Sequence, residues 1–272
     1  MIDLEKVEKV RKTVRSLDDI QPGDVINGIF HEVGDQVWIK LPTILGVDIS
    51  VTKLTVFMWI ATALIIAGAV FVRRNLELVP RGKFANAVEA LVEFIKNDIV
   101  MPNLKEDWKG YMPIFCTFFF FILVNNSIGL IPYLSNPTGN VNVTGTLAGL
   151  TFLTIILGSI NKNGLRGFLR GFVPEGIPVW IAPIIVIAEI VGLFTKSLAL
   201  CIRLFANMVA GHIVILTFIG LIYIMKSWFL VPVPIISNLG LNLLEILIIL
   251  IQTYVFTYLS AIFVGMLIHA HH

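Results

Sequence analysis

The sequence predicts an all-α polytopic membrane protein with about five membrane segments and one amphipathic surface helix. Hydrophobic residues make up 57% of the 272 residues and charged residues only 14%, whereas a soluble domain of this size carries about 25% charge. The deficit is concentrated, because residues 113–160 contain no Asp, Glu, Lys or Arg. The last two apolar segments are longer than an upright span requires. We therefore expect them to form a long, strongly tilted helical hairpin.

The N-terminal part of the chain differs in character from the rest. Residues 1–53 are polar and of mixed charge, so we expect an extramembrane arm followed by a membrane domain over 54–272. The arm starts without the apolar core of a signal peptide, and no ordinary cleavable signal is expected. Within it, GDQVWIKLP at 34–42 alternates enough to suggest a strand or an extended segment.

The first span is expected over 54–72, a stretch that is uncharged and as long as a hydrocarbon core requires. Residues 81–100 then repeat apolar side chains at helical spacing with charges among them. The apolar stripe is too narrow to span, which favours a helix on the membrane surface that begins after Pro80 and ends before Pro102. A helix packed against other protein fits the same pattern equally well.

Two further spans follow in the charge-free region. The second is expected over 113–134, and Asn125 and Asn126 are polar within it, so that face should meet another helix. The third is expected over 141–160 and is rich in small residues suited to close helix packing. Residues 161–176 are basic and rich in glycine, and we expect a loop there.

The last two apolar segments cover 177–225 and 228–270. The first of them would measure about 73 Å as a straight helix, whereas the hydrocarbon core is only about 30 Å thick. It must therefore tilt strongly, break or project. Pro232 and Pro234 lie in the short connection, where prolines are expected to turn the chain. A hairpin of this length would be exceptional, because ordinary transmembrane tilts average about 20°.

Loop charges predict the orientation in the membrane. The 73–112 loop carries seven Lys or Arg and the 161–176 loop carries three, whereas 135–140 carries none and 226–238 carries one. Positively charged loops stay on the cytoplasmic side. Five spans then place the N-terminal arm outside and the C-terminus inside.

Charged residues inside the apolar segments carry the functional argument. Arg203 lies near the middle of 177–225, where a charged side chain costs roughly 2.5–3.5 kcal/mol on insertion scales. A guanidinium does not lose its proton in a protein, so its charge must be used or neutralised. Glu189 and Lys196 precede it at intervals of seven, and each step drifts only about 20° around a helix. These residues therefore share one stripe, and Asn207 lies one turn beyond.

A second polar stripe runs along the last segment. Asn238, Glu245 and Gln252 are also spaced by seven. The two stripes would face each other, a water-filled cavity or a partner. His212 and Glu245 can both exchange protons near neutral pH when buried, as a proton path requires. The structural alternative is a buried network in which the charges simply pair with one another.

Other chemistry-bearing residues give weaker signals. His269, His271 and His272 could bind a metal, but a solvated end of the chain is favoured. Cys116 and Cys201 lie in apolar segments without metal-site spacing and are expected to be small buried hydrophobes. No cofactor and no metal site are predicted. The chain has no phosphate-binding loop and no extended basic patch, so neither nucleotide nor nucleic-acid binding is expected.

The run CIRLFANMVAGH at 201–212, with the charged stripe upstream of it, resembles the signature helix of subunit a of the rotary F-type ATP synthase. NNSIGLIPY at 125–133 and NLLEILIILIQTYVFTYLS at 242–260 support the resemblance, which covers most of 54–270. It implies a non-catalytic stator subunit in the lipid bilayer, beside a rotating ring of small two-helix subunits, subunit c. Peripheral-stalk subunit b and the other ATP synthase subunits are the further partners that it implies.

The resemblance also implies roles for single residues. Arg203 matches the essential arginine that faces the ring carboxylates, and Gln252 matches the glutamine near it on the neighbouring helix. His212 and Glu245 resemble the paired half-channel positions. Further polar positions along the channel helix are matched by Glu189, Lys196 and Asn207. An aspartate that some relatives carry in the second span is Gly129 here, which weakens any role for a carboxylate at that place.

The implied function is to provide two offset half-channels that pass protons to and from the ring carboxylates, coupling ion flow to ATP synthesis. An independent proton channel or secondary transporter is the alternative, but it should show an inverted repeat or a substrate pocket, and no convincing repeat is found. A purely structural scaffold would tolerate the loss of Arg203. The choice between H⁺ and Na⁺ lies mostly in the ring, on another chain.

The polar arm favours the inner membrane of a bacterium, with the mitochondrial inner membrane as the alternative.

Overall fold

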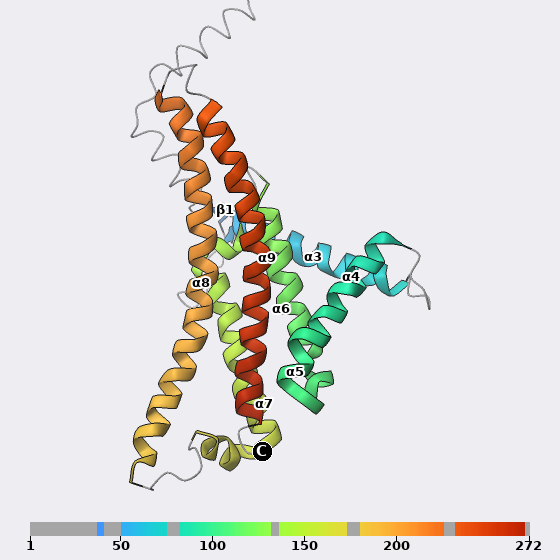
Figure 1. The fold of residues 1–272 in the computed structure, drawn as a ribbon, viewed down its shortest axis with the longest axis vertical. Coiled ribbons are helices and arrows are strands. Elements are labelled where there is room, and N and C mark those ends of the chain that lie inside the picture. Colours follow the sequence, from blue (N-terminus) through green and yellow to red (C-terminus); the bar gives the residue numbers. More distant parts are fainter. Residues whose placement is uncertain are drawn as a thin grey trace, which may run out of the picture.

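The fold is helical, as predicted, in a computed structural model of the chain (Figure 1). Five helices of the described part of the chain are long and apolar enough to cross a membrane. The structure describes residues 37–40, 50–74, 82–131, 136–172, 180–225 and 232–269.

A short two-stranded ribbon precedes the first long helix. Strand β1 (Val37–Ile39) pairs antiparallel with β2 (Val51–Thr52), which confirms the strand predicted within 34–42. Helix α3 (Lys53–Arg74) follows at once, and the Thr52 hydroxyl oxygen accepts a hydrogen bond from the Thr55 N–H at 3.3 Å, as a helix N-cap does. The rest of the predicted extramembrane arm lies outside the described residues.

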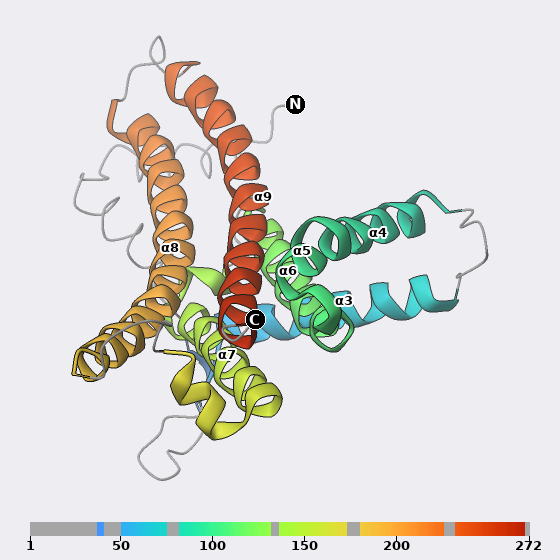
Figure 2. The same cartoon turned by 60° about the horizontal axis from the view of Figure 1, so that its bottom comes forward.

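Helix α3 matches the first predicted span and projects away from the other long helices (Figure 2). Two arginines occupy its last turn, where the free carbonyl groups of a helix favour cations. Only 6% of its apolar window is buried within the chain. Its side chains are therefore available to lipid or to other proteins, as a membrane span requires.

The predicted surface helix is longer than expected. Helix α4 (Lys83–Phe94) continues through a π-helical turn, η1 (Ile95–Val100), into α5 (Met101–Leu104). The prediction that it ends before Pro102 is wrong, because the wide π turn places this proline in the first turn of a new α segment, where its missing N–H costs little. Its position on a membrane surface stays a prediction.

The far end of this helix packs against protein. Residues of η1 contact α6 (Trp108–Gly129) and α9 (Pro232–Ile268), and α5 contacts α9. A short 3-10 turn, η2 (Lys105–Asp107), then leads into α6. The fully buried side chains of this face are Ile95, Ile99, Val100 and Leu104.

Helix α6 corresponds to the second predicted span but starts five residues earlier than 113. Pro113 lies inside it, and the helix tolerates this proline because only the carbonyl of Lys109, in the first turn, loses its partner. Asn125 and Asn126 are fully buried, which confirms that their face meets other protein. The helix ends at Gly129, and part of the predicted 113–134 span lies outside the described residues.

A 3-10 turn, η3 (Pro137–Gly139), connects α6 to α7 (Val141–Arg170). The prediction of a loop over 161–176 is wrong for its first ten residues, because α7 continues through a kink at Gly164. This glycine has φ 68°, a left-handed conformation that other residues rarely adopt. Phe168 and Phe172 then pack edge to face at 4.9 Å, so apolar contacts keep the basic segment helical.

The two longest helices lie side by side and run in opposite directions (Figure 1). Helix α8 (Ala182–Met225) is unbroken over 44 residues, and α9 covers 37. The prolines expected to turn the chain instead lie in the first turn of α9, where proline suits a helix. The connection at 226–231 lies outside the described residues, and the tilt of the pair in a bilayer stays a prediction.

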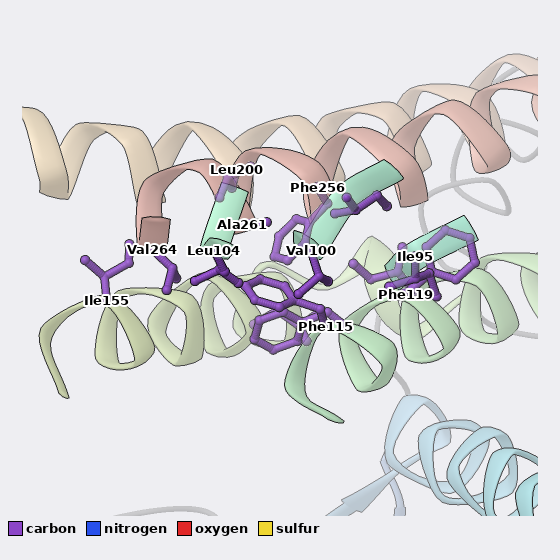
Figure 3. Packing of buried hydrophobic residues seen from close by; sticks show 14 of the residues in the cluster. Ile95, Val100, Leu104, Phe115, Phe119, Ile155, Leu200, Phe256, Ala261 and Val264 are labelled. Atoms are coloured by element: carbon purple, nitrogen blue, oxygen red, sulfur yellow. The ribbon is translucent and has the colours of Figure 1, made fainter. Parts of the chain in front are cut away.

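The hydrophobic core lies where α6, α7 and α9 meet η1 and α5 (Figure 3). Phe118 of α6 packs edge to face on Phe256 of α9 at 5.9 Å. Helix α8 joins this core through Leu193, Leu200 and Leu204, which are buried on one of its faces. The core therefore holds α9 firmly and sets which face of α8 turns inward.

Candidate functional site

Arg203 lies on the face of α8 that the core leaves exposed. Its neighbours Leu200 and Leu204 are 1% and 0% exposed, so the opposite side of the same turns is held by packing. Within the part of the chain that the structure describes, the guanidinium has neither an ion pair nor a hydrogen bond. Its charge is thus presented outward and is not neutralised by a described carboxylate.

The other charged members of the α8 stripe lie on the N-terminal side of Arg203. Glu189 is exposed and Lys196 is half-buried. The Lys196 ammonium lies 5.6 Å from the centre of the Phe263 ring on α9, within the range of a cation–π interaction. Neither side chain forms an ion pair with a described residue. Among the described contacts, Glu189, Lys196 and Arg203 therefore do not pair with one another.

On the C-terminal side of Arg203, the polar side chains of α8 and α9 meet directly. Asn207 donates a hydrogen bond from its amide nitrogen to the Gln252 side-chain oxygen at 3.0 Å. Gln252 is buried, and its own amide nitrogen has no partner among the described atoms. The structure thus brings together two residues that the sequence placed on separate stripes, one turn of α8 from Arg203.

Glu245 lies farther along the same pair of helices. It is 6% exposed, and its carboxylate oxygen is 3.2 Å from the point that a Cβ atom on Gly211 would occupy. The absence of a side chain at Gly211 therefore makes room for the carboxyl group against α8. His212, the next residue, belongs to α8, and its side chain lies outside the described part of the structure.

These contacts divide the polar residues into two groups with Arg203 between them. The helices are antiparallel, so residues farther along α8 contact residues nearer the start of α9. Lys196 lies near Phe263, and Gly211 lies near Glu245. One group lies toward the start of α8 and the other toward its end. A rise of 1.5 Å per residue separates Arg203 from Glu189 and from the position of His212 by about 21 and 14 Å. Chemically, this is a fixed positive charge between two separate polar regions.

A buried polar cluster at the end of α6 was not predicted as part of the site. Asn136 donates from its amide nitrogen to the Met208 sulfur at 2.9 Å, and the Thr138 hydroxyl lies 2.5 Å from the Asn126 side-chain oxygen. The Asn-Pro-Thr-Gly sequence at 136–139 signals a capped turn. The local sequence pattern gives no signal for the contact between Asn136 and Met208, which are 72 positions apart.

The C-terminal histidines are only partly described. His269 lies 3.4 Å from the Asp107 carboxylate, which also pairs with Lys162. The expectation of a solvated end is therefore wrong for His269, while His271 and His272 lie outside the described residues. Among the described residues, no cluster of three or more His, Cys, Asp or Glu side chains is placed to hold a metal.

The expected burial of the cysteines is confirmed for Cys201, whereas Cys116 is half-buried.

Within the described residues, five helices long and apolar enough to cross a membrane define a multi-pass membrane protein. Ionisable side chains on its two longest helices are typical of proteins that handle ions. The chain belongs to the ATP synthase A chain family, whose sequence profile matches residues 55–265. This range contains all seven candidate residues, and the family resemblance predicted from the sequence is confirmed.

Curated relatives support the same assignment. The chain is 40% identical to ATP synthase subunit a of Chloroherpeton thalassium, over 99% of this chain and 79% of the relative. It is 41% identical to ATP synthase subunit a of Myxococcus xanthus, over 83% of this chain and 75% of the relative. It is 42% identical to ATP synthase subunit a of Chlorobium phaeobacteroides, over 81% and 67% respectively. These relatives are all bacterial.

Proposed function

We propose that this chain is the proton-translocating stator subunit of a rotary ATP synthase, and that its α8–α9 pair passes protons to and from the carboxylates of a rotating ring of subunit c. One observation carries the proposal. Arg203 presents outward a positive charge that no described residue pairs, between two groups of polar side chains on a mostly apolar helix. An outward charge at membrane depth is costly unless an anionic partner faces it.

The outer half-channel is assigned to the polar group on the C-terminal side of Arg203. Positive loops place the start of α8 inside and its end outside, so Glu245 and His212 lie toward the outer surface. Gly211 leaves space for the Glu245 carboxyl group, and the Asn207–Gln252 pair lies between it and Arg203. A proton entering here neutralises a ring carboxylate, which then turns into lipid, where a bare carboxylate would be too costly.

The inner half-channel is assigned to the group on the N-terminal side. Glu189 is exposed on the same stripe, and Lys196 lies between it and Arg203. A proton released from the ring after nearly a full turn leaves by this route. The two half-channels are offset along α8, so a proton crosses the membrane only while it is bound to a carboxylate of the rotating ring.

Arg203 separates the two routes. Its guanidinium attracts an ionised ring carboxylate, favours release of the proton there, and repels cations that would otherwise leak from one half-channel to the other. A membrane potential of 100 mV supplies about 2.3 kcal/mol per charge, so several protons must cross for each ATP made. The synthesis itself takes place elsewhere in the complex, and this chain is not catalytic.

The assembly implied by this role contains subunit c, the peripheral-stalk subunit b and the other ATP synthase subunits. The membrane is the inner membrane of a bacterium, which the bacterial origin of the relatives supports.

Replacement of Arg203 by Ala in the whole complex tests the proposal. ATP hydrolysis by the head should survive, ATP-driven proton pumping into vesicles should disappear, and vesicles stripped of the head should leak protons. Full coupled pumping in this variant would refute the role. An independent transporter, by contrast, would move protons when the purified chain is reconstituted without the ring.

A further inference from the structure

A buried cluster of four side chains ties the end of α6 to α8. We call it the Asn136 cluster; its members are Asn126, Asn136, Thr138 and Met208. The Asn136 oxygen accepts from the Thr138 hydroxyl at 2.6 Å and from the Thr138 N–H at 3.1 Å. Its amide nitrogen donates to the Met208 sulfur at 2.9 Å. The Thr138 hydroxyl also reaches the Asn126 oxygen at 2.5 Å, so the four side chains form one chain of contacts.

The cluster is built on a junction of several helices. Turn η3 contacts α3, α6, α7 and α8, and Pro137 and Thr138 within it are buried. Gly129, at the end of α6, lies so close that a Cβ atom there would be 2.6 Å from the Asn136 amide nitrogen and 2.7 Å from its Cβ. The absence of a side chain at Gly129 therefore makes room for the Asn136 side chain, whose amide nitrogen bonds to Met208.

Met208 lies on the buried face of α8, and Arg203 lies on the exposed face. Met208 continues the buried row formed by Leu200 and Leu204. At 100° per residue, Arg203 is about 100° from Leu204 and about 140° from Met208 around the helix axis. A rotation of α8 by about 20° would move a group about 6 Å from the axis by about 2 Å. The contact at Met208 thus sets the direction of the guanidinium from the opposite side of the helix.

Apolar packing selects the buried face of α8 but specifies its exact rotation less tightly than hydrogen bonds do. In a bilayer, lipid tails are as apolar as leucine, so helix pairs are held by close packing and by hydrogen bonds. Near Arg203, three such bonds join α8 to other described elements. They join Cys201 to Thr144 at 3.5 Å, Asn207 to Gln252 at 3.0 Å, and Met208 to Asn136 at 2.9 Å. The Met208 bond is the one that reaches Asn136, at the start of a turn in which Pro137 and Thr138 are buried.

We infer that Asn136 is a positioning residue for ion translocation: through Met208 it fixes the rotational setting of α8 and so the direction of the Arg203 guanidinium. This inference rests on the proposed function, because the direction of Arg203 matters only if a partner charge must meet it. A misplacement of about 1 Å at a reacting site can cost on the order of a hundredfold in rate, so a small rotation is sufficient to impair coupling.

The test uses the assembled complex in membrane vesicles, with ATP-driven proton pumping measured per assembled complex and related to ATP hydrolysis. Asn136→Leu keeps the size of the side chain and removes its hydrogen bonds. Met208→Leu conserves volume and removes only the sulfur acceptor. Each variant should lower the pumping-to-hydrolysis ratio three- to tenfold, or about 0.6–1.4 kcal/mol. Because both variants lose the same Asn136–Met208 bond, the double variant should be no worse than the stronger single variant.

Asn142→Leu is the matched control, since Asn142 is an exposed asparagine on the neighbouring helix α7, and its coupling should be unchanged. A purely structural role would lower the amount of assembled complex but leave the ratio per complex unaltered, and that result overturns the inference. If the Asn136→Leu complex fails to assemble, the Met208→Leu variant tests the inference instead. Normal coupling in Met208→Leu would also overturn the inference. Coupling that survives Arg203→Ala would instead refute the proposed function itself.

Discussion

Replacing Gly265 of α9 by alanine should destabilise the protein, because the backbone of α5 approaches α9 very closely at this glycine. A Cβ atom at position 265 would lie 2.2 Å from the backbone oxygen of Asn103 and 3.0 Å from its carbonyl carbon. The Asn103 carbonyl belongs to α5, between the buried Val100 and Leu104. It has no flexible side chain to move aside, so α5 and α9 must separate by about 1 Å to restore an ordinary contact.

The size of the effect follows from two opposing terms. Overpacking a well-packed interior typically costs about 1–3 kcal/mol, and alanine returns up to about 1 kcal/mol through its higher helix propensity than glycine. A net loss of about 1–2 kcal/mol is expected at Gly265. At roughly 2–4 °C per kcal/mol for a chain of this length, the unfolding midpoint should fall by about 2–8 °C.

Gly240, on the same helix, supplies the matched control. A Cβ atom there would meet nothing within 4 Å, so Gly240→Ala should keep only the gain in helix propensity and leave the midpoint equal or higher. The assay is thermal unfolding of the purified complex in detergent, with the release of this subunit as the measured signal. If Gly265→Ala proves as stable as Gly240→Ala, the close approach of α5 to α9 is not as described, and the reasoning fails.

Three further predictions concern the polar seam and the C-terminal end. Arg203→Lys should abolish ATP-driven pumping as Arg203→Ala does, because an ammonium lacks the planar, forked geometry of the guanidinium; coupled pumping at a wild-type rate would contradict this. Gly211→Val should displace the Glu245 carboxyl group and lower pumping at least tenfold, whereas Gly192→Val, with open space around it, should not. Lys162→Ala removes a half-exposed ion pair and should lower stability by less than about 1 kcal/mol in a denaturation experiment; a larger loss would show that the pair matters more than its exposure suggests.

Membrane segments could be recognised from composition because the bilayer constrains them so strongly. Any spanning backbone must satisfy its own hydrogen bonds, which leaves helices of about twenty apolar residues. The 54–72 and 141–160 stretches meet that condition, and both lie within described helices. Buried Asn125 and Asn126 were foreseen for the same reason, since amide side chains facing lipid would be costly.

Helix ends were predicted less well because glycine and proline signals depend on their surroundings. Pro102 follows a π turn, and Pro113 lies close to the N-terminal end of α6, so neither ends its helix. Residues 161–170 are basic and contain two glycines, yet Phe168 packs against Phe172 and the core. At 161–170 a tertiary contact outweighs a local preference of about 1 kcal/mol, whereas at the two prolines a place near the start of a helical segment makes the missing N–H tolerable.

The amino-acid order by itself determines that polar or charged side chains recur every seven residues on the two longest helices, and hence that each carries one polar stripe. A heptad interval keeps a residue on the same side of a helix whatever surrounds it. Only the tertiary structure decides how the stripes meet: Asn207 bonds to Gln252, Glu245 lies against Gly211, and Arg203 stays outward. The physical reason is that register and rotation between two helices depend on packing against third elements, here the core and Asn136, which no local pattern encodes.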